Sequence, residues 1–175
     1  RQPDGHYPGV YTASGKGDDY GRTERQRLTM QAILKKVKQL SPEEMIELAI
    51  GQLQYSYTPY SGFKVGAALL TKDGKFYTGC NIENAAFTPT NCAERTAFFK
   101  AVSEGEREFR AICIVGGKDG VLTEYAAPCG VCRQVMMEFC DPETFQIILA
   151  TGKEQYEIFT LKELLPQGFG PTNLA

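Results

Sequence analysis

The sequence predicts a layered α/β domain, and three observations support this prediction. Segments with helical periodicity alternate with short apolar or alternating segments that are typical of strands. Turn-forming Gly, Asp and Pro residues separate these segments. The chain has 175 residues, of which 42% are hydrophobic, and this is enough for one well-packed core. We therefore expect one domain over residues 23–175.

The N-terminal part of the chain divides into an arm and two helical segments. Residues 1–22 are rich in Gly, Asp and Tyr without an apolar period, which predicts a flexible arm. Residues 23–40 are predicted to form an extra helix, because apolar residues recur there at helical spacing: Met30, Ile33, Leu34, Val37 and Leu40. Ser41 and Pro42, followed by two glutamates, predict the start of a second helix that runs to about Gln54.

The remainder alternates between strands and helices. Strands are expected at residues 65–70, 75–78, 111–115, 145–150 and 155–159. The Lys72-Asp73-Gly74 sequence predicts a hairpin turn between the first two. The run 111–115 is uninterruptedly apolar, which is typical of a strand buried on both faces. Helices are expected from Cys92 to before Gly105 with Ala93, Ala97, Phe98 and Ala101 buried, from Pro128 with Val131, Val135 and Phe139 in one row, and over residues 161–165.

Composition excludes several classes of function. The net charge of −2 provides no basic face for a nucleic-acid partner. No apolar run is long enough for a membrane span, and we see no pattern of a secretory signal. Without secretory features, a Cys-x-x-Cys pair among the six cysteines is more typical of metal binding or catalysis than of a disulfide framework. We expect a reducing, cytoplasmic compartment.

Two cysteine clusters predict a zinc site. Cys129 and Cys132 are three residues apart at an expected helix start, so both sulfurs lie on one face where the helix end favours thiolates. Cys92 begins an earlier expected helix. If the two helix starts face each other, they close a cup of three sulfurs. A zinc ion held by three protein ligands and an open position for water is the arrangement of a catalytic site.

The residues after Cys92 suggest how such a site would work. Glu94 could exchange protons with a zinc-bound water as a general acid and base. Three thiolates around a divalent cation leave a net negative charge, so we expect Arg95 to donate hydrogen bonds to the sulfurs. Cys80 remains open as a fourth ligand, and the only histidine, His6, lies in the arm. A redox-active Cys-x-x-Cys pair, or a zinc module that binds nucleosides or partners without catalysis, are the alternatives.

The cysteine clusters resemble those of a known family. Cys-Ala-Glu-Arg at residues 92–95 and Pro-Cys-Gly-Val-Cys-Arg-Gln at residues 128–134 are similar to the small, homotetrameric class of zinc-dependent cytidine deaminases. Residues 60–68, residues 79–85 and the C-terminal Leu-Leu-Pro with Phe169 extend the resemblance. It covers about residues 55–171 and implies a three-layer α/β/α domain with a mixed central sheet of about five strands.

The resemblance also implies roles. Cys92, Cys129 and Cys132 would hold Zn2+, and Glu94 would carry protons from water to the pyrimidine ring and to the departing amine. The reaction would be hydrolytic deamination of free cytidine and deoxycytidine to uridine and deoxyuridine in pyrimidine salvage. The other implied site residues are Ala93 at the base edge, Asn81 and Glu83 at the ribose, Phe63 beside the nucleoside, Phe87 and Phe169 in a neighbouring subunit's pocket, and Arg95 and Gln134 beside the sulfurs.

Phe87 is a departure, because many relatives have Tyr at this position. Two alternative substrates remain. A blasticidin S deaminase would use a similar three-cysteine site, whereas the Asn81–Glu83 loop favours an ordinary ribose. An enzyme that edits polynucleotides would need a basic groove with exposed aromatic side chains, and the acidic balance disfavours it.

Overall fold

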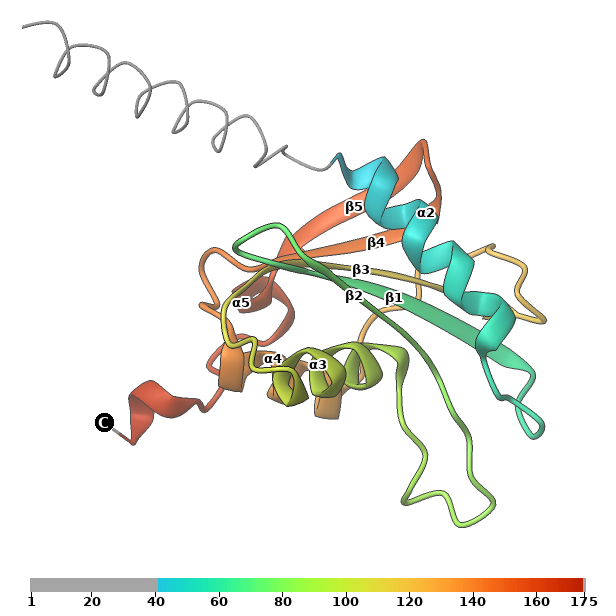
Figure 1. The fold of residues 1–175 in the computed structure, drawn as a ribbon, viewed down its shortest axis with the longest axis horizontal. Helices are drawn as coiled ribbons and strands as arrows, with labels where there is room; N and C mark the ends of the chain where they lie inside the picture. The colour runs from blue at the N-terminus through green and yellow to red at the C-terminus, as the bar shows by residue number, and fades with distance from the viewer. Residues whose placement is uncertain (1–40, 175) are drawn as a thin grey trace, which may run out of the picture. The chain divides into compact units, whose positions relative to one another are not determined.

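The computed structural model describes residues 41–174, which form a five-stranded mixed sheet with helices on both faces (Figure 1). The strands are β1 (Phe63–Thr71), β2 (Phe76–Cys80), β3 (Phe109–Lys118), β4 (Gln146–Gly152) and β5 (Gln155–Thr160), in the spatial order β2-β1-β3-β4-β5. The pair β3–β4 is parallel and the other three pairs are antiparallel. This confirms the predicted three-layer architecture. The expected arm 1–22 and helix 23–40 lie outside the described residues and stay predictions.

The helices begin where local sequence favours them. Helix α2 (Pro42–Gln52) has Pro at its first position, and the Ser41 hydroxyl accepts a hydrogen bond from the Glu44 N–H. The short 3-10 helix η1 (Leu53–Tyr55) follows directly. The remaining helices are α3 (Ala93–Ser103), α4 (Gly130–Phe139), α5 (Leu161–Leu164) and the 3-10 helix η2 (Pro171–Asn173).

The sheet separates two hydrophobic cores. Alternate β3 residues enter opposite cores: Ile112 and Ile114 pack with α3 and α4, whereas Cys113 and Val115 pack with α2. The prediction of a strand buried on both faces is therefore confirmed. Figure 1 shows α2 on one face of the sheet and α3 and α4 on the other.

The predicted row of Val131, Val135 and Phe139 on α4 is confirmed in part, because Val135 and Phe139 pack against the core. Val131 is 59% exposed, whereas Cys132 and Met136 are buried. The helix is therefore rotated so that Cys132, and not Val131, faces the core. The pattern of hydrophobic residues does not predict this rotation, because Cys132 is expected at the metal site and not in the core.

Close packing of α3 against β2 depends on a glycine. A Cβ atom on Gly79 would lie 2.4 Å from the Ala93 carbonyl oxygen and 2.6 Å from the Ala97 nitrogen. The absence of a side chain therefore lets the first turn of α3 lie directly on the strand. Among residues 41–174, none of the helices combines the length and the hydrophobicity that a membrane crossing requires.

Candidate metal centre

Three cysteine sulfurs converge at the N-terminal ends of α3 and α4. Cys92 is the residue before α3 and Cys129 the residue before α4, and both have extended backbone conformations. The Cys129 sulfur accepts a hydrogen bond from the Cys132 N–H at 3.4 Å. Both helix ends therefore direct free N–H groups and the positive ends of their dipoles toward the sulfurs, which stabilises thiolates.

The spacing of the sulfurs fits a tetrahedral zinc site. The Sγ atoms of Cys92 and Cys129 are 3.9 Å apart, and those of Cys129 and Cys132 are 3.4 Å apart. Zn–S bonds of about 2.3 Å at tetrahedral angles place sulfurs about 3.8 Å apart. Among residues 41–174, these three cysteines are the group whose ligand atoms all lie within 4.8 Å of one another. Their thiolate chemistry also suits zinc.

Glu94 lies beside this cluster in the first turn of α3 and is only 4% exposed. Burial raises the pKa of its carboxyl group to about 7, and the nearby Cys92 contributes in the same direction. A carboxyl group with a pKa near neutrality can both accept and release a proton at physiological pH. The site thus combines a ligand set for a metal with a buried proton carrier.

Arg95 supplies positive charge next to the sulfurs. Its Nη2 atom lies 3.7 Å from the Cys92 sulfur and donates to the Thr90 carbonyl at 3.0 Å. A hydrogen bond from Cys132 is the largest cause that lowers the pKa of the Cys92 thiol to about 5, and Arg95 adds to it. The same bond and burial raise the pKa of Cys132. Of these two cysteines, Cys92 is therefore the one that more readily forms a thiolate.

The loop after β2 carries two polar residues that were expected at a ribose. The Asn81 amide bridges to strand β1, accepting from the Val65 N–H and donating to the Phe63 carbonyl, both at 2.8 Å. The Glu83 Oε2 atom accepts from the N–H groups of Tyr60 at 2.9 Å and Ser61 at 3.1 Å. Since these donors engage one carboxylate oxygen, Oε1 is able to accept a hydroxyl hydrogen.

The remaining predicted site residues lie in different settings. Ala93 is fully buried, whereas Phe63, Phe87 and Phe169 are exposed, Phe87 by 82%. The Gln134 side chain donates to the Phe169 carbonyl at 2.9 Å, and its support of the sulfurs stays a prediction.

Sequence reasoning missed a structural role for Arg133. Its guanidinium donates to the Pro128 carbonyl at 2.8 Å and to the Leu164 carbonyl at 2.6 Å, and so joins the start of α4 to the C-terminal segment. The contact with Leu164 depends on how the C-terminal segment packs on α4, so no local pattern around Arg133 signals it.

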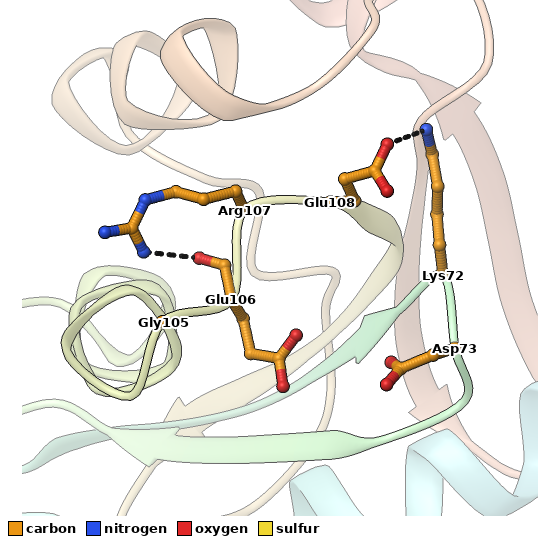
Figure 2. Close-up of a pocket in the computed structure, with 6 residues that line it drawn as sticks. All are labelled: Lys72, Asp73, Gly105, Glu106, Arg107 and Glu108. Carbon is orange, nitrogen blue, oxygen red and sulfur yellow. Dashed lines mark hydrogen bonds and ion pairs between the residues drawn. The ribbon is translucent and has the colours of Figure 1, made fainter.

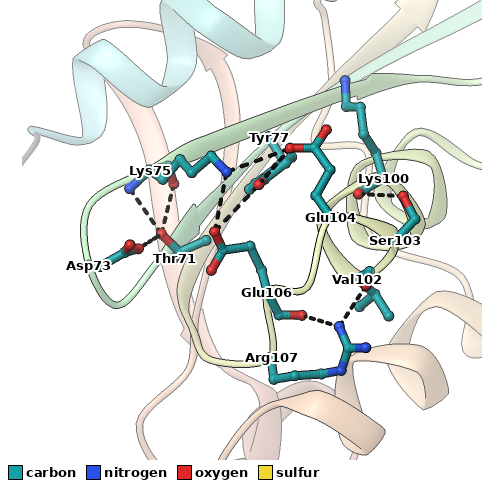
Figure 3. Close-up of polar contacts among 10 residues, drawn as sticks. All are labelled: Thr71, Asp73, Lys75, Tyr77, Lys100, Val102, Ser103, Glu104, Glu106 and Arg107. Atoms are coloured by element: carbon teal, nitrogen blue, oxygen red, sulfur yellow. Dashed lines mark hydrogen bonds and ion pairs between the residues drawn. The ribbon is translucent and has the colours of Figure 1, made fainter.

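A second cluster of ionisable side chains lies at the other end of α3 (Figure 3). The Lys75 ammonium lies 3.5 Å from Glu104 and 3.3 Å from Glu106, and 4.7 Å from the centre of the Tyr77 ring. The Tyr77 hydroxyl lies 3.0 Å from the Glu104 carboxylate. Lys75 and Glu104 are half exposed, whereas the Tyr77 ring is buried beneath them.

A cavity of about 550 Å3 lies next to this cluster (Figure 2). Its lining consists of Lys72, Asp73, Gly105, Glu106, Arg107 and Glu108. Lys72 pairs with Glu108 at 2.8 Å, and both side chains are more than half exposed. The lining of the cavity offers this exposed ion pair and no buried reactive group, so the sulfur cluster is the better candidate site.

A mixed sheet between helices, with three cysteine sulfurs at two helix starts and a buried carboxyl group beside them, is the arrangement of a zinc-dependent hydrolytic enzyme. Comparison with known proteins agrees with this class. The family model described as the cytidine and deoxycytidylate deaminase zinc-binding region matches residues 40–148. The chain belongs to this family and carries its zinc-binding region.

Individual relatives support the assignment over most of their length. A cytidine deaminase of Sporosarcina psychrophila is 47% identical over 133 residues, which are 76% of this chain and 94% of that protein. A probable cytidine deaminase of Dictyostelium discoideum is 41% identical over 75% of this chain and 86% of that protein. The crystal structure of cytidine deaminase from Burkholderia pseudomallei superposes with a TM-score of 0.68 at 44% identity, covering 74% of this chain and all of that chain.

Proposed function

We propose that this protein catalyses the hydrolytic deamination of free cytidine and deoxycytidine to uridine and deoxyuridine. The observation that carries the proposal is the position of a buried carboxyl group, Glu94, beside three converging sulfurs in a chain of the deaminase family. When bound by Cys92, Cys129 and Cys132, zinc supplies a Lewis acid that makes water a stronger nucleophile at neutral pH.

The proposed chemistry assigns both proton transfers to Glu94. Its carboxylate removes one proton from water as the oxygen attacks the ring carbon that bears the amine, and delivers this proton to the adjacent ring nitrogen. Glu94 then moves the hydroxyl proton to the amine, the carbon–nitrogen bond breaks, and ammonia leaves as the carbonyl of uridine forms. A pKa of about 7, raised mainly by burial, suits a carboxyl group that must gain and lose a proton within one turnover.

The proposed substrate contacts come from the β2 loop and from α3. Glu83 accepts a ribose hydroxyl through Oε1, while the Tyr60 and Ser61 amides hold Oε2. Asn81 fixes this loop against β1 and offers its second amide hydrogen to the sugar. Phe63 packs beside the nucleoside, and the backbone at Ala93 contacts the base.

We further propose a homotetramer in which neighbouring subunits complete each pocket, within a reducing cytoplasmic compartment. Phe87 and Phe169 support the oligomer, because both are largely exposed. Phe87 also has a φ of 57°, which is unfavourable for a bulky side chain without compensating contacts. Light scattering tests this arrangement, and a monomer at active concentrations would remove the roles of both rings.

The decisive experiment for the proposed reaction compares kcat/KM on cytidine and on blasticidin S for the zinc-loaded protein. We expect turnover of cytidine, with blasticidin S as the poorer substrate. A clear preference for blasticidin S would overturn the proposed substrate. A protein with full zinc that turns over no cytosine nucleoside would overturn the proposed enzyme.

A further inference from the structure

The turn after strand β3 reaches across to the loop that holds Glu83. The Lys118 ammonium donates a hydrogen bond to the Ser61 carbonyl, and the Asp119 N–H donates to the Gly62 carbonyl at 2.8 Å. Two adjacent carbonyls of the loop are therefore held by two adjacent residues at the end of the strand.

The backbone is shaped for this close approach. Gly62 has a φ of +63°, and a Cβ atom there would lie 2.7 Å from the Lys118 ammonium nitrogen. Asp119 also adopts a positive φ of 53°. A left-handed conformation at a non-glycine residue costs about 1 kcal/mol, so other contacts in the turn must stabilise it.

The same loop residue faces Glu83 through its amide. Ser61 donates its N–H to the Glu83 Oε2 atom at 3.1 Å, next to the Tyr60 N–H at 2.9 Å, and offers its carbonyl to Lys118. Hydrogen bonding by the Ser61 side chain is the largest cause that lowers the pKa of Glu83, and the charge of Lys118 acts in the same direction. The ammonium thus acts on Glu83 through Ser61 and through space.

We propose that Lys118 is a positioning residue for ribose recognition, which holds the Ser61 backbone so that its amide fixes the Glu83 carboxylate toward the sugar hydroxyls. The inference rests on the proposed function, in which Glu83 binds the ribose. In this role Lys118 acts through Ser61 and not on the reacting atoms. Its contribution is therefore confined to nucleosides whose sugars carry hydroxyl groups.

The test compares Lys118→Met with the native protein on cytidine, and measures Ki for a cytosine dideoxynucleoside that lacks both ribose hydroxyls. We expect KM for cytidine to rise about 5-fold, as loss of one exposed charged hydrogen bond predicts, with kcat changed less than about 2-fold. Ki for the dideoxynucleoside should not change. Lys118→Arg should restore KM, because guanidinium can also donate to the carbonyl.

Two further variants separate the possible outcomes. Lys72→Met removes an exposed lysine that lines the cavity near the C-terminal end of α3 and should leave KM unchanged, which controls for the loss of one charge. In a Glu83→Gln background, Lys118→Met should cause no further rise in KM, because both changes act on one contact. Zinc content and Tm of every variant show whether the fold is retained.

The inference is overturned if Lys118→Met raises KM for cytidine and Ki for the dideoxynucleoside by the same factor. It is also overturned if the effects of Lys118→Met and Glu83→Gln on KM for cytidine are fully additive. It is also overturned if Glu83→Gln raises KM for cytidine while Lys118→Met does not. If Glu83→Gln itself leaves KM for cytidine unchanged, the proposed ribose contact fails, and this result is distinct from a failure of Lys118 alone.

Discussion

The two ends of helix α3 both gather ionisable side chains, but only the N-terminal end buries a carboxyl group away from water. Glu94 is 4% exposed, and burial raises its pKa to about 7. At the other end, the side chains of Glu104 and Lys75 are each about half exposed and lie 3.5 Å apart. Solvated pairs of this kind contribute about 0–1 kcal/mol. Desolvation, rather than the number of charges, therefore creates a reactive carboxyl group.

The backbone adds to this difference. The N-terminal end of α3 presents unpaired N–H groups toward the sulfurs, which favours negative charge there. At the C-terminal end, Arg107 donates to the Val102 carbonyl at 2.6 Å and so satisfies one of the terminal acceptors (Figure 3). One end is therefore prepared for anionic ligands and chemistry, whereas the other is closed by its own side chains.

The largest expected effect comes from the same substitution at both ends. Glu94→Gln should reduce kcat by about 1,000-fold or more, because the amide cannot carry protons, while the metal is retained. Glu104→Gln should change kcat less than about 2-fold, since it alters an exposed ion pair and a hydrogen bond from Tyr77 at the opposite end of α3 from the sulfurs. The fall of cytidine absorbance measures both rates. Similar losses of kcat in the two variants would show that the two ends of α3 do not differ in their contribution to catalysis.

Substitutions in the middle of α3 test whether packing in the core holds this helix in place. Phe98 is fully buried, and its ring lies 5.0 Å from Phe109 and 6.1 Å from Phe145. Phe98→Ala should lower the free energy of unfolding by about 3–5 kcal/mol, since it leaves a cavity among these rings. The neighbouring Phe99→Ala, at a 47% exposed position, should cost about 1 kcal/mol or less in the same urea titration. Equal costs would show that the burial pattern is wrong.

Removal of zinc should affect the N-terminal end of α3, where the sulfurs lie, and not its C-terminal end. A chelator should abolish turnover and lower Tm by about 10 °C, because zinc binds the folded state and stabilises it through linkage. The chelator should lower the Tm of Glu94→Gln by the same amount, since Glu94 is not a zinc ligand. Calorimetry with and without added zinc measures the shift. An unchanged Tm with full metal loss would exclude a stabilising site at the sulfurs.

The smallest effect is expected at the C-terminal cluster. Lys75→Met should lower the free energy of unfolding by less than about 1 kcal/mol, even though Lys75 contacts two carboxylates and an aromatic ring. The difference should shrink further at high salt, which screens exposed charges. Urea titrations at low and high salt provide the measurement. A loss of several kcal/mol would mean that this cluster is as desolvated as Glu94.

Local signals predicted most of the secondary structure. The Ser-Pro-Glu-Glu sequence predicted α2, and the apolar run at residues 111–115 predicted the central strand β3. The Cys-Ala-Glu-Arg and Pro-Cys-x-x-Cys sequences predicted two helix starts with ligands, and the structure brings those starts together. These features depend on hydrogen bonding and periodicity within a few residues, which the sequence encodes directly.

Features that depend on contacts between residues far apart in the sequence could not be predicted from local patterns. The burial of Glu94 depends on packing between α3, α4 and the sheet, and no local pattern reports it. The exposure of Val131 follows from the rotation of α4 that directs Cys132 inward. The contacts of Glu83 with two backbone amides required the loop geometry near Gly62, which only the fold defines.

X-ray absorption spectroscopy at the zinc edge of the purified native protein tests directly whether three cysteines hold the metal and leave one position open. We expect one zinc per chain, with three sulfur neighbours at about 2.3 Å and one oxygen or nitrogen neighbour at about 2.0–2.2 Å. Four sulfur neighbours would mean that Cys80 or another thiol closes the site. Protein without zinc, in which Cys129 and Cys132 form a disulfide, would contradict the account altogether.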